Sequence, residues 1–240
     1  MSFRRFSDCS VSEKMLYTLF IGLIGVGYLF AMLLIFESVA SLDGKPGLSA
    51  DDIVIKYSGN REGTRLESAL DGVMSAYRSE DERETIVSWI YAGAPEARFN
   101  EEVKDIVASK CAGCHARGSS LAELTSYDKV MELVVMDTGE SLATLARVSH
   151  IHLFGTGILF YLLGRIFILT EMRPWLKRTM VAVPFAAIAM DIGSWWFTRY
   201  AAGFFAYTVI VGGALMGLSF AFQTFASLYQ MWFYKPKAQV

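Results

Sequence analysis

The chain has 240 residues, of which 53% are hydrophobic and only 19% are charged, and its mean hydropathy is +0.36. This composition is too apolar for an ordinary soluble domain and indicates a small integral membrane protein of one or two domains. The formal net charge of −2 gives the whole chain no attraction for nucleic acid, so we expect no nucleic-acid partner. Three cysteines and three histidines allow one ligand cluster of these types, which argues against a disulfide scaffold or a multi-metal enzyme.

Four segments are long and apolar enough to span a membrane, which takes roughly 20 residues as a helix. The first could be mistaken for a signal peptide, because two arginines precede it and Ser38-Val39-Ala40 follows it. Its apolar core of 22 residues is too long for a cleaved signal, so we interpret it as an anchor. The four predicted spans are Met15–Phe36, Val148–Leu169, Thr179–Phe197 and Phe204–Phe233.

Basic residues gather in three short segments beside these spans and predict the orientation of the chain. The three segments contain eight Lys and Arg residues, which are Arg4, Arg5, Lys14, Arg173, Lys177, Arg178, Lys235 and Lys237. They contain three acidic residues, which are Asp8, Glu13 and Glu171. The positive-inside rule therefore puts both termini and the loop between spans two and three in the cytoplasm of a bacterial cell, with the chain in the inner membrane.

The segment Glu37–Arg147 lies between the first two spans and is expected on the periplasmic side. Its 111 residues include 20 acidic and 12 basic ones, so its surface should attract a basic partner. We divide the chain into residues 1–36, with the first span, 37–147, the periplasmic domain, and 148–240, with the other three spans. The fold class is all-α, a four-helix transmembrane bundle with an inserted helical domain.

Five capping signals predict where helices begin in the inserted domain, because each pairs a Ser, Thr or Asn with an acidic residue in the following first turn. The pairs are Ser49 with Asp52, Thr64 with Glu67, Ser79 with Glu82, Asn100 with Glu101, and Thr125 with Asp128. The glycine-punctuated stretch 57–64 is interpreted as a turn.

The motif Cys111-Ala112-Gly113-Cys114-His115 has the spacing at which haem c is attached. Two thiols three residues apart can bond the two haem vinyl groups, and the histidine that follows can bind the iron. A zinc site is disfavoured because the chain has no second cysteine pair, and a redox dithiol does not explain the histidine. We therefore expect one covalently bound haem c, held by Cys111 and Cys114, with His115 as the proximal ligand.

Around this motif the chain resembles the membrane-anchored monohaem c-type cytochromes, and Glu101–Lys110 is similar to the N-terminal helix of a cytochrome c domain. The resemblance covers about 40 residues, and its specific part is the five-residue motif. The four-span layout also resembles a set of proteobacterial inner-membrane proteins. The chain departs from a typical cytochrome c, which supplies a methionine ligand from a late loop, because only 34 residues separate His115 from His150.

The sixth iron ligand therefore has several candidates. His150 is preferred and His152 is the alternative, since both lie near the outer end of the second span and a helix directs the two rings about 200° apart. Met131 and Met136 are the methionine alternatives, and an open or externally filled position is a third.

Asp191 lies about 10 Å inside the third span, at 1.5 Å of helix rise per residue. An acidic side chain at that depth marks a candidate quinol or proton site, with Trp195 nearby, although a hydrogen bond between helices explains it equally well.

The sequence predicts a cytochrome that transfers single electrons between membrane-level and periplasmic carriers, as one subunit of a respiratory or oxygenase complex. One alternative is a quinol-oxidising subunit, in which His150, His152, Asp191 and Trp195 would form a site near the outer leaflet. Another is a structural accessory subunit, which the glycine-rich spans favour.

Overall fold

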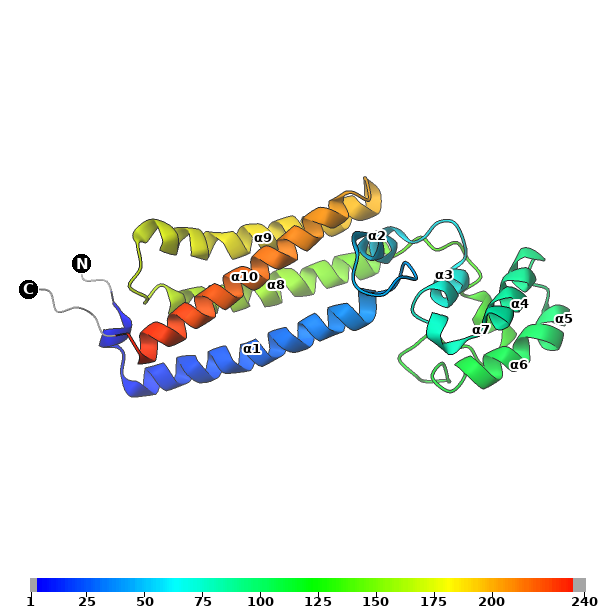
Figure 1. Ribbon diagram of the computed structural model, residues 1–240, viewed down its shortest axis with the longest axis horizontal. Helices are drawn as coiled ribbons and strands as arrows, with labels where there is room; N and C mark the ends of the chain where they lie inside the picture. Colours follow the sequence, from blue (N-terminus) through cyan, green and yellow to red (C-terminus); the bar gives the residue numbers. More distant parts are fainter. Residues whose placement is uncertain (1–3, 235–240) are drawn as a thin grey trace, which may run out of the picture. The chain divides into compact units, whose positions relative to one another are not determined.

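The computed structural model describes residues 4–234, which fold into two compact units (Figure 1). The bundle unit consists of Met1–Glu37 and Ser141–Val240, and the inserted unit is Ser38–Glu140. Within the described residues every regular element is helical and none is a strand. The all-α prediction is therefore confirmed.

The bundle unit contains four helices that are long and apolar enough to cross a membrane, as predicted. The first three helices are longer than the predicted spans, and the fourth is one residue shorter at each end. Their bounds are Val11–Val39 (α1), Leu142–Phe167 (α8), Pro174–Tyr200 (α9) and Phe205–Trp232 (α10), and a short 3₁₀ turn, η1, covers Phe6–Asp8. Lys235 and Lys237 lie outside the described residues.

Helices α9 and α10 approach each other closely where Gly212 faces Asp191. A Cβ atom added to Gly212 would lie 2.8 Å from the Cβ of Asp191, so only glycine fits this contact. Close approach through small residues is the usual way in which membrane helices pack.

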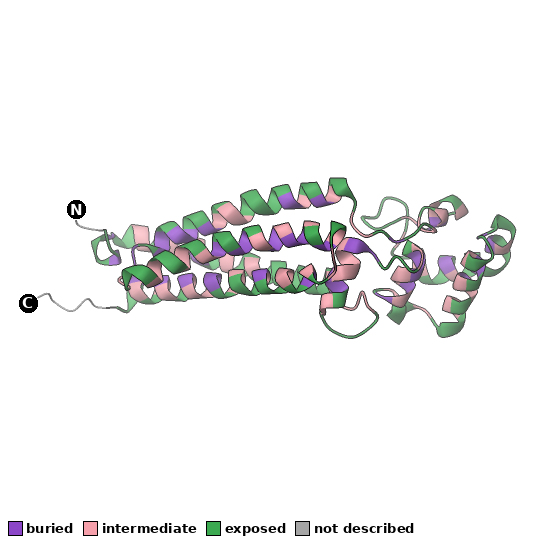
Figure 2. Ribbon diagram, turned by 90° about the horizontal axis from the view of Figure 1, so that it is seen from above, coloured by how far each residue is buried: buried purple, intermediate pink, exposed green. Residues whose placement is uncertain are grey.

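Helix α1 is mostly exposed, and Ile21 is its only buried residue among those described. It contacts α10 where the rings of Tyr28 and Phe220 stack, with their centroids 4.8 Å apart. Exposed residues lie between the buried ones along the four long helices (Figure 2), and many of the exposed residues are large and hydrophobic. An exposed apolar surface is what a lipid-facing helix requires.

The inserted unit is built from short helices and turns. Their bounds are Ala50–Ser58 (α2), Arg65–Asp71 (α3), Ser75–Tyr77 (η2), Glu80–Tyr91 (α4), Glu96–Arg98 (α5), Phe99–Val103 (η3), Lys104–Ile106 (α6), Val107–Cys111 (η4) and Tyr127–Met131 (α7). Three predicted capping boxes are present, with Ser49, Thr64 and Ser79 as N-caps.

Two predicted helix starts are wrong. Asn100 lies inside a helical run that already begins at Glu96, and its side chain donates a hydrogen bond to the Glu96 carbonyl. The cap of α7 is Ser126 instead of Thr125, and its hydroxyl accepts a hydrogen bond from the Lys129 amide. In both cases the helix begins a few residues away from the predicted cap, because several neighbouring polar residues could serve as the cap.

The core of the inserted unit surrounds Trp89, whose side chain is fully buried. Its indole N–H donates to the Pro95 carbonyl at 3.1 Å, and its ring packs against Phe99 and Tyr127. The Tyr127 hydroxyl donates to the Ala94 carbonyl at 2.9 Å. The large aromatic side chains are thus buried with their polar atoms satisfied, as a stable core requires.

The stretch 57–64 does more than form a turn, because it lies against residues 135–139 near the end of the inserted unit. The Arg65 amide donates to the Val135 carbonyl at 2.8 Å, beside an isolated bridge between Thr64 and Met136. Gly59 and Gly139 both have positive φ, and a Cβ on Gly59 would lie 2.3 Å from the Asp137 carbonyl oxygen. The crossing ties the first and last parts of the inserted unit together and needs glycine at both positions.

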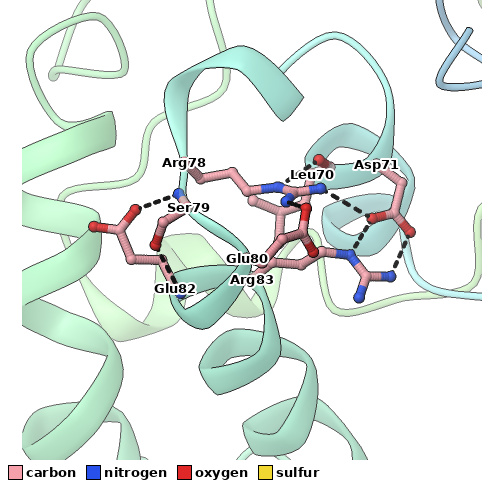
Figure 3. Close-up of polar contacts among 7 residues, drawn as sticks. All are labelled: Leu70, Asp71, Arg78, Ser79, Glu80, Glu82 and Arg83. Atoms are coloured by element: carbon pink, nitrogen blue, oxygen red, sulfur yellow. Dashed lines mark hydrogen bonds and ion pairs between the residues drawn. The ribbon is translucent and has the colours of Figure 1, made fainter.

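An ion-pair network joins α3 to α4 (Figure 3). Arg83 donates two hydrogen bonds to the carboxylate of Asp71, while Arg78 donates to the Leu70 carbonyl at 3.1 Å and lies 3.7 Å from Asp71. The hydrogen bonds from Arg83 hold the pKa of the Asp71 carboxyl below its usual value. The carboxylate therefore stabilises the fold above its usual pKa, and this contribution is lost as the pH falls through the lowered value.

Asp71→Asn is expected to weaken this junction at neutral pH by about 0.5–1 kcal/mol, a modest value because the pair is partly exposed. Amide exchange in α3 and α4 of the full-length protein should then be a few times faster at pH 7, and the difference from wild type should disappear as the pH falls through the lowered pKa of Asp71. Asp105→Asn is the control, since Asp105 is exposed and has no ion pair among the described residues. Equal effects of the two variants would contradict the assignment.

Candidate functional site

The Cys111–His115 motif follows a helical run that includes α5, η3, α6 and η4. Two stretches of this run, Phe99–Val103 and Val107–Cys111, have π-helical hydrogen bonding, and the second ends at the first cysteine of the motif. Such stretches insert an extra residue into a turn and are frequent at functional sites. Val103 and Val107 are buried in the core and fix this run in place.

One tight backbone turn contains the three reactive residues of the motif. The amides of Cys114 and His115 both donate to the Cys111 carbonyl, at 3.1 and 2.9 Å. Both cysteines are free thiols. Cys111 is half-buried against the hydrophobic core, whereas Cys114 is exposed. The two thiols therefore differ in their exposure to solvent.

The His115 ring is oriented by a backbone carbonyl. Its Nδ1 lies 2.7 Å from the Ala122 carbonyl oxygen, which fixes the proton on Nδ1 and leaves Nε2 as the nitrogen with a free lone pair. The Leu124 amide donates back to the His115 carbonyl at 3.0 Å, and the Leu124 side chain is buried. This is the arrangement by which proteins orient a histidine that binds a metal.

The electrostatics of the motif disfavour a redox-active dithiol. Burial raises the pKa of the Cys111 thiol, aided by the nearby Glu82 carboxylate. Reactive dithiols have lowered pKa values, which a helix N-terminus or a cation provides. Cys111 instead ends a helical run, where the helix dipole opposes a negative charge.

The described residues contain no group of three or more His, Cys, Asp or Glu side chains that could hold a metal ion. A haem iron takes one protein ligand on each side, so its binding does not need such a group. Of the two methionines considered, Met131 packs against the same core as Cys111, while Met136 is 62% exposed beside the bridge to Thr64.

The two histidines of α8 have different surroundings within the bundle unit. His152 packs edge-on against Trp195 of α9, with ring centroids 5.2 Å apart, and its Nδ1 lies 2.9 Å from the Val148 carbonyl. His150 is exposed, and its ring contacts Phe154 on its own helix. The two rings thus contact different helices, and both histidines are exposed.

Asp191, Trp195 and His152 form one cluster. Asp191 is buried, and Trp195, one turn later on the same face of α9, is hydrogen-bonded to its side chain. His152 packs edge-on against the same Trp195 ring. The sequence predicted these three residues, together with His150, as one site, and in the structure Trp195 links Asp191 to His152.

Several contributing groups were not expected from the sequence. The Ala122 carbonyl has no sequence signature, because any residue can supply a backbone oxygen. Ser149 accepts a hydrogen bond from the Trp196 indole at 3.0 Å and so links α8 to α9 beside the histidines. The only sequence feature that could have indicated this contact is the position of Ser149 directly before His150.

The part of the chain after the motif matches a known family. Residues 118–238, half of the chain, match a family described as a transmembrane helical domain. The chain belongs to this family. The match includes α8, α9 and α10 and begins three residues after His115, so the Cys111–His115 motif lies outside it. Comparison with curated proteins and with solved structures gave no match.

Proposed function

We propose that the chain is a membrane-bound c-type cytochrome, which transfers single electrons between membrane-level and periplasmic carriers as a subunit of a larger complex. The observation that carries this proposal is the arrangement of the Cys111–His115 turn. Two free thiols share one turn with a histidine whose Nδ1 is held by the Ala122 carbonyl. No other constellation in the described residues has such a specific chemical use.

In this proposal Cys111 and Cys114 would each hold a single haem c through a thioether bond, formed by adding the thiol to one vinyl group. His115 would offer Nε2 to the iron, and the Ala122 carbonyl holds the His115 ring with its proton on Nδ1. A haem held there supplies a one-electron redox centre. The half-buried Cys111 joins the attachment point to the core around Val107, which favours a fixed position of the centre.

The proposed location is the bacterial inner membrane, with the inserted unit in the periplasm and both termini in the cytoplasm. Arg5 forms an ion pair with Glu171 at 3.0 Å, so the N-terminal segment lies beside the loop between α8 and α9. Lys177 and Arg178 lie in the first turns of α9, at the same end of the bundle. Basic residues concentrated at one end of the spans favour this orientation.

The cluster of Asp191, Trp195 and His152 favours a second candidate function, quinol oxidation. The buried Asp191 carboxyl is a candidate acceptor for a proton that a quinol releases, and the His152 imidazole packs against the same Trp195. Quinol oxidation also releases two electrons, whereas the proposed chain holds one one-electron centre and needs a partner for the second. This imbalance is why electron transfer remains the preferred proposal.

Reduction kinetics of the purified full-length protein distinguish the two functions. We expect a reduced, basic, soluble cytochrome to exchange electrons with the protein rapidly, at a rate that falls tenfold or more, roughly, as ionic strength rises from about 0.01 to 1 M. The inserted segment has the acidic excess that such steering requires. An added short-chain quinol should not reduce the isolated protein.

The quinol function would be established instead if the quinol reduced the wild-type protein but did not reduce Asp191→Asn, while the visible spectrum of the variant stayed unchanged. Gly213→Ala is a matched control for helix packing, because a Cβ at Gly213 meets no atom within 4 Å. Electron exchange that does not depend on ionic strength would contradict docking on the acidic segment.

A further inference from the structure

An open cavity of about 780 Å³ lies in the bundle unit, at the end that carries the N-terminal segment and the loop between α8 and α9. One wall is apolar and comes from α1 and α8, with Leu16, Phe20, Leu162 and Ile166. The volume is within the range of small-molecule sites, roughly 300–1,000 Å³. The cavity is separate from the Cys111–His115 turn and from the Asp191 cluster.

The polar side of the cavity has an unbalanced positive charge. Its lining includes four basic residues and no acidic one, with Arg4, Arg165, Lys177 and Arg178 as the basic members. Arg4 is paired with Glu13, and Lys177 donates to the Ile168 carbonyl at 2.9 Å. Within residues 4–234, Arg165 and Arg178 have no hydrogen-bond or ion-pair partner on the chain.

Helix α9, which supplies Lys177 and Arg178, adds to the excess of positive charge at the cavity. The first turn of α9 has no acidic residue, although the N-terminal end of a helix dipole is itself positive. Cations beside a membrane span are costly unless they contact water or an anion. An anion bound in the cavity would offset the charge of Arg165 and Arg178 together.

We propose that the cavity binds one anionic phospholipid, whose phosphate contacts Arg165, Lys177 and Arg178 and whose acyl chains lie along the apolar wall. Basic pockets between transmembrane helices bind acidic lipid headgroups in this way. The apolar wall decides between a lipid and a free anion, because a free phosphate would leave the wall unused. Acyl chains bury the exposed surface of Leu16 and Leu162.

The test measures binding of lipids to the delipidated full-length protein in detergent, by native mass spectrometry. Phosphatidylglycerol is compared with phosphatidylcholine of the same acyl chains, so the headgroup charge is the variable. Each basic residue near such a headgroup contributes about 1 kcal/mol, so Arg165→Gln or Arg178→Gln should weaken phosphatidylglycerol binding about fivefold, and the double variant about 25-fold. Phosphatidylcholine binding should be weaker and unaffected.

Arg173→Gln is the matched control, since Arg173 is exposed immediately before α9 but does not line the cavity. It should change phosphatidylglycerol binding less than twofold. Arg165→Lys with Arg178→Lys keeps both charges and should retain binding, which separates the loss of charge from a folding defect.

Three outcomes would overturn the proposal. Equal binding of the two lipids by the wild-type protein would exclude recognition of the headgroup charge. An Arg173→Gln effect as large as that of Arg178→Gln would show general attraction by the basic end of the bundle. Displacement of phosphatidylglycerol by millimolar inorganic phosphate would identify a free-anion site, for which the apolar wall has no role.

Discussion

Replacing both Cys111 and Cys114 with alanine is expected to abolish covalent haem binding. The haem would then have no bond to the polypeptide that survives denaturation, because each thiol supplies one of the two thioether bonds. Each single alanine variant should lower the covalent haem content, since one attachment bond remains. The measurement is peroxidase staining of haem on the denatured chain after electrophoresis, with protein from a bacterial host that attaches haem c.

Cys9→Ala provides the matched control for loss of a thiol. Cys9 is also a free cysteine, but it is buried in the N-terminal segment of the bundle unit, remote in sequence from the motif. Its replacement should leave the haem staining unchanged. Covalent haem on the double variant of Cys111 and Cys114 would show that the attachment site is wrongly assigned.

The spans were predictable because a bilayer imposes a length and an apolar composition that appear directly in the sequence. The helix starts at Ser49, Thr64 and Ser79 were predictable for a similar reason, since a capping box involves residues only three positions apart. Local features of this kind do not depend on the rest of the fold.

Features that depend on distant residues were not predictable. The close crossing of Gly59 and Gly139 brings together residues that are far apart in the chain, and the sequence indicated only a turn at 57–64. The π-helical turn that ends at Cys111 also has no residue signature. It results from packing Val103 and Val107 into the core while the chain continues into the motif.

The candidate site divides in the same way. Cys111, Cys114 and His115 form a contiguous motif, so the sequence was sufficient to select them. The Ala122 carbonyl that orients His115 is a backbone group and could not be selected. The contact of His152 with Trp195 depends on how α8 packs against α9. The spacing of the two histidines predicts only that their rings point in different directions.

The different surroundings of the two α8 histidines lead to the second large effect that we expect. His150→Ala should convert the oxidised haem from a low-spin to a high-spin spectrum, because it removes the side chain that the sequence favours as the sixth iron ligand. His152→Ala should leave the spectrum unchanged, since its ring is held against Trp195 and its Nδ1 faces the Val148 carbonyl. The two variants remove the same imidazole two residues apart, so each controls for the other.

Wild-type protein provides an independent reading of the same ligand. With two histidine ligands, the oxidised haem should lack the sulfur-to-iron absorption band at the red end of the visible spectrum, and its potential should be lower than with methionine, which raises the potential. A band of that kind, lost in Met131→Ala and retained in His150→Ala, would instead assign the role to Met131, which shares the core with Cys111. The same result in Met136→Ala would assign it to Met136, whose side chain is exposed near the end of the inserted unit.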